Sequence, residues 1–320
     1  MLILRLPPPL YPGAINLMPK APPTRFLDAK ILRSIANIEL KARLLVEGMY
    51  ASRHRSPDYG YSVEFVDHRE YAPGDELRTI DWKMLARTER YYVKRFEMES
   101  NMNVMCLLDV SGSMGYRPQN ADQLSKLEYG SYLAAAMSHL AAHQQDSPGL
   151  ITFDREMRDF IPPKQGRRHL FTIFTKLESL SASGPSDLGP TLKNIVQRLK
   201  RRGVILLITD CHSGHESVID GIRHLVARRH EVVVIHLLDA DEVKFPFQEL
   251  TSFRDLETGA QLMTDPLRLR KNYLDRLEKF RTAIKEGCAS CGADYRFVDT
   301  SEPIELILRD YLLLRRQRGR

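Results

Sequence analysis

The stretch CLLDVSGSMG, residues 106–115, changes character halfway along. Its first part closes an apolar segment, NVMCLLD at 103–109, which is typical of a buried strand. The apolar residues then give way to Asp109, Ser111 and Ser113, so that three side chains carrying oxygen stand at every second position. A run of this kind at the end of a strand indicates a site built from carboxylate and hydroxyl oxygens.

Short apolar segments alternate with amphipathic ones from about residue 101 to residue 316. The expected strands after the first are GLITF, VILLITD, EVVVIHLLD and DYRFVD, with REMRDFIP as a short edge strand. Amphipathic helical segments lie between them. This alternation predicts an α/β domain with a doubly wound, mostly parallel sheet that is covered by helices on both faces.

Two aspartates are expected at one edge of this sheet. Asp109 ends its strand, and Asp210 ends VILLITD at 204–210. Ligands bind beyond the carboxyl ends of the strands in such sheets. If the two strands are neighbours, two carboxylates and two serine hydroxyls surround one point. Oxygen ligands without Cys or His favour Mg²⁺, Mn²⁺ or Ca²⁺.

The same residues resemble the metal-ion-dependent adhesion site of von Willebrand factor A domains. DVSGS supplies the first ligand group, Asp109, Ser111 and Ser113. The resemblance implies a second ligand at Ser186, because GPSD at 184–187 stands where the family has a GGTD-like turn. It implies Asp210, in ITDCHSG, as the third. Thr191 is a weaker alternative to Ser186, because it is expected inside the following helix.

The remaining segments differ in composition. Residues 1–23 are rich in proline and are expected to be a disordered leader. Residues 24–48 have helical periodicity and predict an amphipathic helix that ends near Gly48. Residues 49–100 are aromatic, charged and rich in turns, and they predict a small β-rich subdomain. Residues 317–320 form a basic tail.

Opposite charges gather around the single tryptophan of the chain, within the segment 49–100. The candidate patch consists of Asp75, Arg78, Asp81, Trp82 and Arg87. An internal ion-pair network around an aromatic anchor and a partner-binding surface both agree with this pattern. The sequence does not separate these two interpretations.

Residues 45–316 also resemble the bacterial domain-of-unknown-function 58 family, whose signature matches EFVDHREYAPGDELRTIDWKMLARTERYYVKRF at 64–96. Later landmarks are SKLEYG, GRRHL, HLLDADEVKFPF, FRDLETG and DYRFVDT. The resemblance implies a non-catalytic interaction module, which acts with a MoxR-type AAA+ ATPase in the assembly or maturation of an unknown client protein. It also implies a cytoplasmic protein without membrane contact, and the four cysteines fit a reducing compartment.

Two other function classes stay open. A metal-dependent hydrolase could use the same site, with His212 as the candidate base. A nucleic-acid-binding protein would agree with the net charge of +6, but the basic residues are dispersed, so nucleic acid is not the expected partner. The phosphate-binding sequence GxxxxGK[ST] does not occur, which excludes nucleotide hydrolysis by that route.

Overall fold

The computed structural model describes residues 2–4, 32, 35, 37–53, 68–70, 85–87, 90–94, 102–118 and 123–318. The chain divides into two compact units. One unit contains residues 1–51 and 102–320, and the other contains residues 52–101. The candidate site lies in the first unit.

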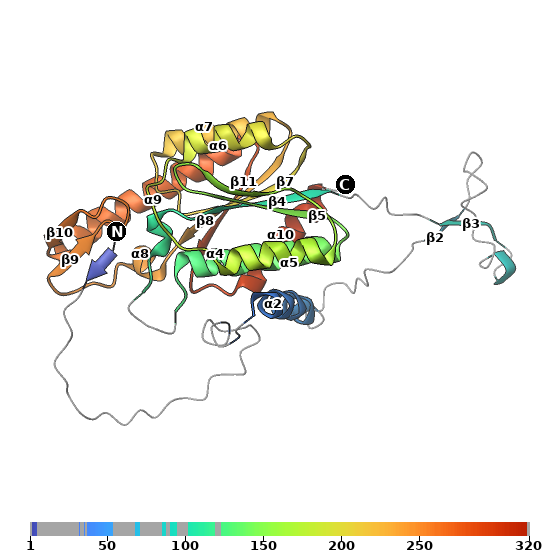
Figure 1. Ribbon diagram of the computed structural model, residues 1–320, viewed down its shortest axis with the longest axis horizontal. Coiled ribbons are helices and arrows are strands. Elements are labelled where there is room, and N and C mark those ends of the chain that lie inside the picture. The colour runs from blue at the N-terminus through green and yellow to red at the C-terminus, as the bar shows by residue number, and fades with distance from the viewer. Residues whose placement is uncertain are drawn as a thin grey trace, which may run out of the picture. The chain divides into compact units, whose positions relative to one another are not determined.

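A six-stranded sheet forms the centre of the first unit (Figure 1). Its order is β11-β8-β7-β4-β5-β6, and all neighbours are parallel except β5 and β6. The strands are β4 (Asn103–Asp109), β5 (Ser147–Phe153), β6 (Met157–Ile161), β7 (Gly203–Thr209), β8 (Glu231–Leu238) and β11 (Asp294–Asp299). The predicted doubly wound, mostly parallel sheet is therefore confirmed, with β6 as the expected edge strand.

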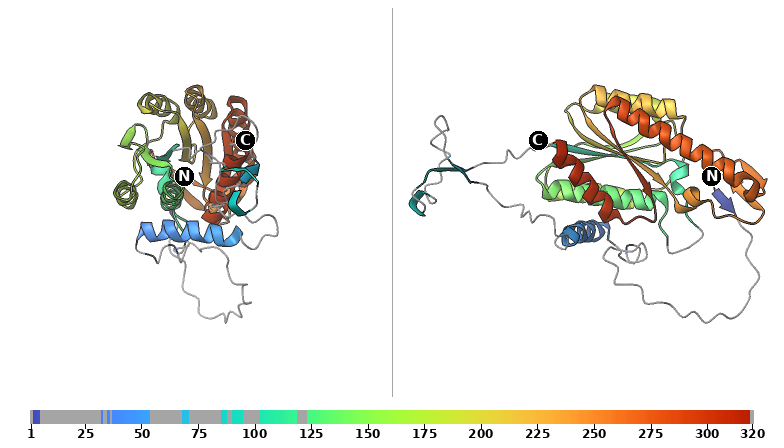
Figure 2. Two further views of the ribbon diagram at one scale, coloured as in Figure 1. Left: turned by 90° about the vertical axis from the view of Figure 1, so that its right-hand side faces the viewer. Right: turned by 180° about the vertical axis from the view of Figure 1, so that it is seen from behind.

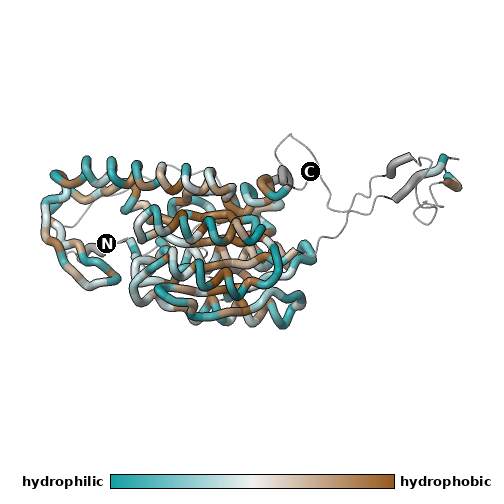
Figure 3. The backbone as a smooth tube through the Cα atoms, turned by 90° about the horizontal axis from the view of Figure 1, so that it is seen from above, coloured by the Kyte–Doolittle hydropathy of each residue, from teal (hydrophilic) through white to brown (hydrophobic). Residues whose placement is uncertain are grey.

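Helices cover both faces of this sheet (Figure 2). The first face is covered by α4 (Lys126–His143), α5 (Arg167–Glu178) and α10 (Ile304–Arg318), and α2 (Ile38–Arg53) adds its apolar side chains to the same core from outside these helices. The second packs against α6 (Leu188–Arg198), α7 (His215–Ala227) and α9 (Pro266–Cys291). Because alternate strand residues point to opposite faces, Cys106 and Leu108 join the first core while Leu107 joins the second. Figure 3 shows the hydrophobic colour concentrated along the central strands.

The helix expected at 24–48 has other limits. Leu32 is helical, but Ile35 and Asn37 lie outside a helix, and α2 begins at Ile38 and ends at Arg53. Asn37 fixes the start, because its Oδ1 accepts the backbone N–H groups of Glu39 (2.7 Å) and Leu40 (3.3 Å). Gly48 does not end the helix but lies within it, facing the side chain of Glu305 on α10.

Three residues of the expected disordered leader form a strand, so that prediction is wrong for them. β1 (Leu2–Leu4) pairs antiparallel with β9 (Thr251–Arg254), which also pairs with β10 (Gln261–Thr264). The apolar sequence LIL suits pairing at a free sheet edge. The rest of residues 1–23 lies outside the described residues, and the end of the basic tail, 319–320, does as well.

The second unit contains a short antiparallel pair, β2 (His68–Glu70) with β3 (Tyr92–Lys94). Asp75, Arg78, Asp81 and Trp82 lie outside the described residues. Arg87 belongs to a helical turn at 85–87 and is exposed. The ordered charged patch around Trp82 therefore stays a prediction. In the parts of the chain that the structure describes, no helix has both the length and the apolar character needed to cross a membrane.

A buried histidine gives the first unit a testable dependence on pH. His236 on β8 is fully buried, and its Nδ1 lies 2.8 Å from the hydroxyl of Tyr295. Burial lowers the pKa of His236 to about 4. An unfolded histidine titrates near about 6.5. The unfolded chain therefore gains a proton that the folded chain does not accept, and stability is lost as the pH falls from about 6.5 to about 4.

We expect His236→Phe to remove this loss, which amounts to about 3 kcal/mol of unfolding free energy. Phenylalanine suits the site, because His236 already lies among the rings of Phe280 and Phe297. Urea unfolding at about pH 7 and about pH 4.5 measures the effect. Exposed His215 provides the control, His215→Phe. Equal losses between the two pH values in wild type and His236→Phe would contradict the assignment.

Candidate metal centre

The turn after β4 brings the DVSGS residues together. Asp109 is fully buried, and its Oδ1 accepts the backbone N–H of Ser111 at 2.9 Å. This bond turns the chain back over the strand end and into a short 3-10 helix, Gly112–Gly115. The hydroxyl oxygens of Ser111 and Ser113 consequently lie 3.1 Å apart. Three oxygen-bearing side chains thus meet at the carboxyl end of β4.

Asp210 comes to the same place because β7 is the parallel neighbour of β4, as the pairing of Leu108 with Ile208 shows. Thr209 at the end of β7 donates its hydroxyl to Asp109 Oδ2 at 2.6 Å. Asp210 follows and is buried. Burial and the charge of Asp210 raise the pKa of Asp109 to about 7. A cation between these carboxylates would relieve this repulsion.

The loop that carries Ser186 lies against the β4 turn. Gly112 donates its backbone N–H to the carbonyl of Gly184 at 2.8 Å, and Ser183 donates to the carbonyl of Val110 at 2.9 Å. The Ser186 Oγ is buried and has no hydrogen-bond partner. A buried hydroxyl oxygen without a partner has lost its hydrogen bonds to water, which destabilises the fold unless another group binds the oxygen.

Thr191, the weaker alternative to Ser186, is already satisfied elsewhere. It lies on α6, and its hydroxyl donates to the carbonyl of Arg155 at 2.7 Å. The structure therefore gathers Asp109, Ser111, Ser113, Ser186 and Asp210 at one sheet edge and engages Thr191 away from the serine hydroxyls. Ser186 is the better candidate for the second ligand group.

Lys126 is part of the site, although the sequence reasoning did not single it out. It is buried on the first turn of α4, and its Nζ lies 2.8 Å from Asp210 Oδ2 and 3.0 Å from Glu242 Oε1. Burial acts to raise the pKa of Asp210, but the ammonium of Lys126 outweighs it and lowers that pKa to about 2. Burial acts to lower the pKa of Lys126, but Asp210 and Glu242 together outweigh it and raise that pKa, so the ammonium stays charged. The sequence could have indicated this role, because a lysine on the apolar face of a predicted helix is buried only when it has a charged partner.

Glu257 is the second residue that the sequence reasoning missed. It lies in the turn between β9 and β10, inside the family landmark FRDLETG. Its Oε2 accepts the backbone N–H of Ser186 at 3.0 Å, while its Oε1 is buried without a hydrogen-bond partner. A Cβ on Gly112 would lie 2.7 Å from the carbonyl oxygen of Leu256, so the turn packs directly on the DVSGS segment.

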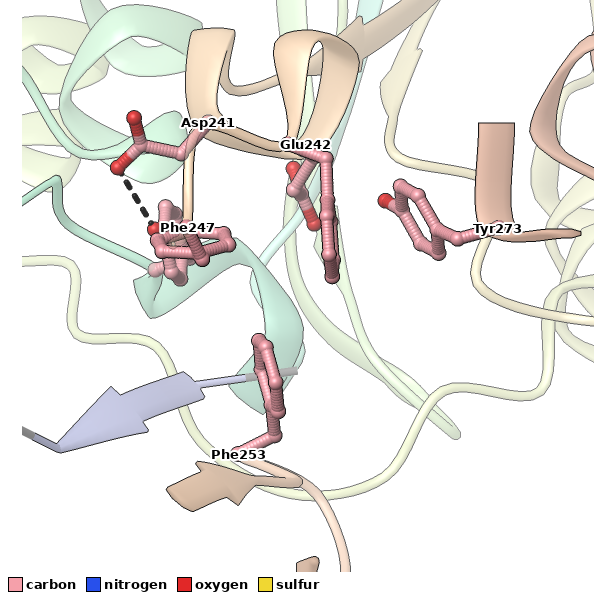
Figure 4. A pocket seen from close by; sticks show the side chains of 7 residues that line it. Asp241, Glu242, Phe247, Phe253 and Tyr273 are labelled. Carbon is pink, nitrogen blue, oxygen red and sulfur yellow. Dashed lines mark hydrogen bonds between the residues drawn. The ribbon is translucent and has the colours of Figure 1, made fainter. Parts of the chain in front are cut away.

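An aromatic cluster anchors the β9–β10 hairpin beside the site. Phe253 on β9 packs against Phe245 and Phe247, with ring centroids 5.7 and 5.6 Å away. Figure 4 shows Phe247, Phe253 and Tyr273 around a small pocket that Glu242 also lines. Glu242 belongs to α8 (Ala240–Lys244) and thus connects the aromatic cluster with Lys126.

An open hollow beside β7 and β8 is lined by Asp210, His212 and Arg276, among others. Asp210 is the one candidate ligand that borders it. The side chain of His212 is exposed, and its backbone N–H donates to Asp210 Oδ1 at 3.2 Å. A partner side chain entering this hollow would therefore approach the site next to Asp210, whose own side chain is buried.

The donor set suits a hard divalent cation. Within the described residues, no group of three or more His, Cys, Asp or Glu side chains is placed to hold a metal ion. Any ion at this edge must therefore use serine hydroxyls beside the aspartates, as Mg²⁺, Mn²⁺ and Ca²⁺ do readily. The unpartnered Ser186 Oγ supplies an oxygen that such an ion would satisfy.

Comparison with known proteins places the chain in a family. The model described as "Protein of unknown function DUF58" matches residues 67–283, and the chain belongs to this family. Uncharacterized protein Rv1480 of Mycobacterium tuberculosis and Uncharacterized protein Mb1516 of Mycobacterium bovis are both similar to it. Each is 24% identical over 273 residues, which cover 83% of this chain and 84% of the relative.

Solved structures with a similar arrangement have low sequence identity. One is BatB from Bacteroides thetaiotaomicron, a conserved hypothetical protein, with 18% identity and a TM-score of 0.45 over 66% of this chain and 97% of BatB. Another is the SpRpn10 VWA domain, with 12% identity and a TM-score of 0.37 over 65% of this chain and 94% of that domain. The sheet order and the helices on both faces make this fold von Willebrand factor A-like.

Proposed function

We propose that this DUF58 protein is a non-catalytic interaction module that binds a divalent cation and, through it, a carboxylate of a partner protein. Mg²⁺ is the expected ion, with Mn²⁺ and Ca²⁺ as alternatives. Asp109, Ser111, Ser113, Ser186 and Asp210 would hold it. The observation that carries the proposal is the buried, unpartnered Ser186 Oγ at the same sheet edge as two carboxylates and two serine hydroxyls.

The charge of this ligand set favours binding of a carboxylate. Serine hydroxyls are neutral, and Lys126 already offsets part of the charge of Asp210. A divalent ion held there keeps a net positive charge, so a carboxylate from another protein is a suitable further ligand. The proposed path for that carboxylate is the open hollow that Asp210 borders.

A hydrolase would need more than this arrangement provides. General base catalysis requires a base within hydrogen-bond reach of the nucleophile. The side chain of His212 is exposed, while Ser111 Oγ shares a hydrogen bond with Ser113 Oγ. Nucleic acid is disfavoured as well, because the basic residues of the chain are dispersed along the sequence. Both observations favour the interaction module.

We further propose, from the family resemblance, that the partner is a MoxR-type AAA+ ATPase together with a client protein. The cytoplasm is the proposed location, because Cys106, Cys211, Cys288 and Cys291 are all free thiols, which suits a reducing compartment.

The test is capture of a purified MoxR-type ATPase by the full chain on a resin. In Mg²⁺ the wild type should retain the ATPase, and a chelator should reduce capture at least about 10-fold, since a lost charged contact commonly costs that much. Asp109→Asn should behave in Mg²⁺ as the wild type does in chelator. Asp220→Asn, which alters an exposed carboxylate on α7, is the matched control and should capture normally. Equal capture by Asp109→Asn and wild type, or capture that survives chelator, would contradict the proposal.

A further inference from the structure

We propose that the hollow beside β7 and β8 is the docking site for an acidic segment of the partner protein that carries a large apolar side chain. The apolar side chain packs against α9, and an acidic side chain pairs with Arg276. This inference rests on the proposed function, because it names the chemistry of the partner whose carboxylate would approach the cation next to Asp210. It adds a surface that the metal ligands do not include.

Helix α9 presents an apolar face to the hollow along its N-terminal half. Its C-terminal half is packed into the second core, since Ile284 and Cys288 are fully buried. Tyr273, Leu277 and Phe280 come before this part and line the hollow, where each is only half-buried. Their spacing of four and three residues places them on one side of the helix. Figure 2 shows the length of α9, from beside α7 to the β9–β10 hairpin.

The size and the wall of the hollow suit an apolar side chain. Its volume of about 530 Å³ lies within the range of about 300–1,000 Å³ that is typical of ligand pockets. The Tyr273 ring packs on Phe245, with ring centroids 4.7 Å apart, and Phe280 lies edge-on to His236 at 6.0 Å. These contacts fix the wall before a partner arrives, so that docking does not have to order it.

The charges around the hollow favour an acidic partner. Asp210 and Glu242 line it, but both are paired with Lys126. Arg276 is exposed at the same hollow, and no described residue forms an ion pair or hydrogen bond with its guanidinium. With the proposed divalent cation bound, positive charge therefore exceeds negative charge here. An acidic side chain supplies the missing counter-charge, whereas a basic segment is repelled.

One short segment can reach both features. Arg276 directly precedes Leu277, and Tyr273 and Phe280 lie about one helical turn to either side. A large apolar side chain with acidic neighbours therefore matches this surface, with the apolar group at the centre and the charges at the rim. A purely acidic segment would leave the apolar wall in contact with water, and a purely apolar one would leave Arg276 unpaired.

The experiment measures binding of labelled peptides to the full chain in Mg²⁺ by fluorescence anisotropy. The probe is a glutamate-rich peptide with one central phenylalanine, and the reference peptide has alanine at the centre. Wild type should bind the probe at least about 10-fold more tightly than the reference, since burial of a phenylalanine side chain gives this factor. Leu277→Ala should reduce this preference at least about 3-fold. Leu267→Ala, at an exposed position of α9 that does not line the hollow, is the matched control and should retain it.

Charge reversal tests the second contact. Arg276→Glu should weaken binding of both peptides at least about 10-fold, because it replaces an attraction by a repulsion. Lys271→Glu makes the same change of charge at an exposed position of α9 outside the hollow, and it should bind both peptides nearly as wild type does. Circular dichroism verifies that each variant is folded.

The docking surface is wrong if wild type binds neither peptide or does not distinguish them, or if Arg276→Glu binds as Lys271→Glu does. Chelator and Asp109→Asn separate this inference from the proposed function. If they weaken binding while the variants at the hollow do not, the metal-dependent function stands and the docking surface is wrong. If only the variants at the hollow weaken binding, the docking surface stands and the metal-dependent function is wrong.

Discussion

Asp109→Asn is expected to stabilise the metal-free protein while it removes the metal site. At about pH 8 the free energy of unfolding should rise by about 2 kcal/mol. Burial and the nearby Asp210 raise the pKa of Asp109 to about 7. The unfolded carboxyl titrates near about 3.9. The wild type therefore loses stability as the pH rises from about 4 to about 7, and above about pH 7 the loss is complete.

The expected size follows from the same shift. Three pKa units correspond to about 4 kcal/mol as an upper limit. Asparagine keeps the acceptor that Ser111 N–H uses, but the Thr209 hydroxyl loses its present acceptor, which costs about 1–2 kcal/mol. Removal of the buried charge still dominates. The charge of Asp109 therefore destabilises the metal-free protein, as expected for a residue whose role is to bind a cation.

Chemical unfolding in chelator measures this effect at about pH 8 and about pH 5. The gain from Asp109→Asn should shrink at the lower pH, where the wild-type carboxyl is protonated in the folded state. Asp220→Asn is again the exposed control. An Asp109→Asn variant that is less stable than wild type at both pH values would mean that the carboxylate is a structural group.

Lys126→Met is expected to lower the free energy of unfolding of the metal-free protein by about 3–5 kcal/mol. Methionine replaces the buried stem of the lysine, so packing changes little. The large loss arises because Asp210 and Glu242 keep their buried charges without the ammonium that now binds both. Millimolar Mg²⁺ should recover part of the loss, since the ion supplies positive charge beside Asp210.

Urea unfolding of Lys126→Met with and without Mg²⁺ measures both effects. Lys193→Met, at an exposed position of α6, is the matched control and should change stability by less than about 0.5 kcal/mol. Adding Asp210→Asn to Lys126→Met should restore part of the stability in chelator and abolish the recovery by Mg²⁺. A Lys126→Met protein as stable as wild type would contradict this expectation. It would show that the attraction within the ion pair only equals the free-energy cost of removing its charges from water.

The sheet could be predicted from the sequence because its signal is local. Each central strand is an apolar run bounded by polar residues. Asp109 at the end of β4 and Asp210 just after β7 mark the edge where ligands bind. Parallel pairing of β4 with β7 then brings the two aspartates together. The start of α2 is also encoded locally, by the Asn37 cap, whereas apolar periodicity alone runs across the break at Ile35 and Asn37.

The other half of the site could not be predicted in this way, because it depends on contacts between distant segments. Lys126 meets Asp210 across 84 positions of sequence, and Ser186 meets Glu257 across 71. No periodicity or spacing links such pairs. Only the folded chain places a buried ammonium and a hairpin carboxylate beside the DVSGS turn.

Calorimetric titration of Mg²⁺ into the chelator-free full chain tests the central claim, that this sheet edge is a divalent cation site. Wild type and Asp220→Asn should each bind one ion per chain. Asp109→Asn should show no binding, although it is folded and more stable than wild type without metal. Absence of binding by the wild type, or equal binding by Asp109→Asn, would contradict the account.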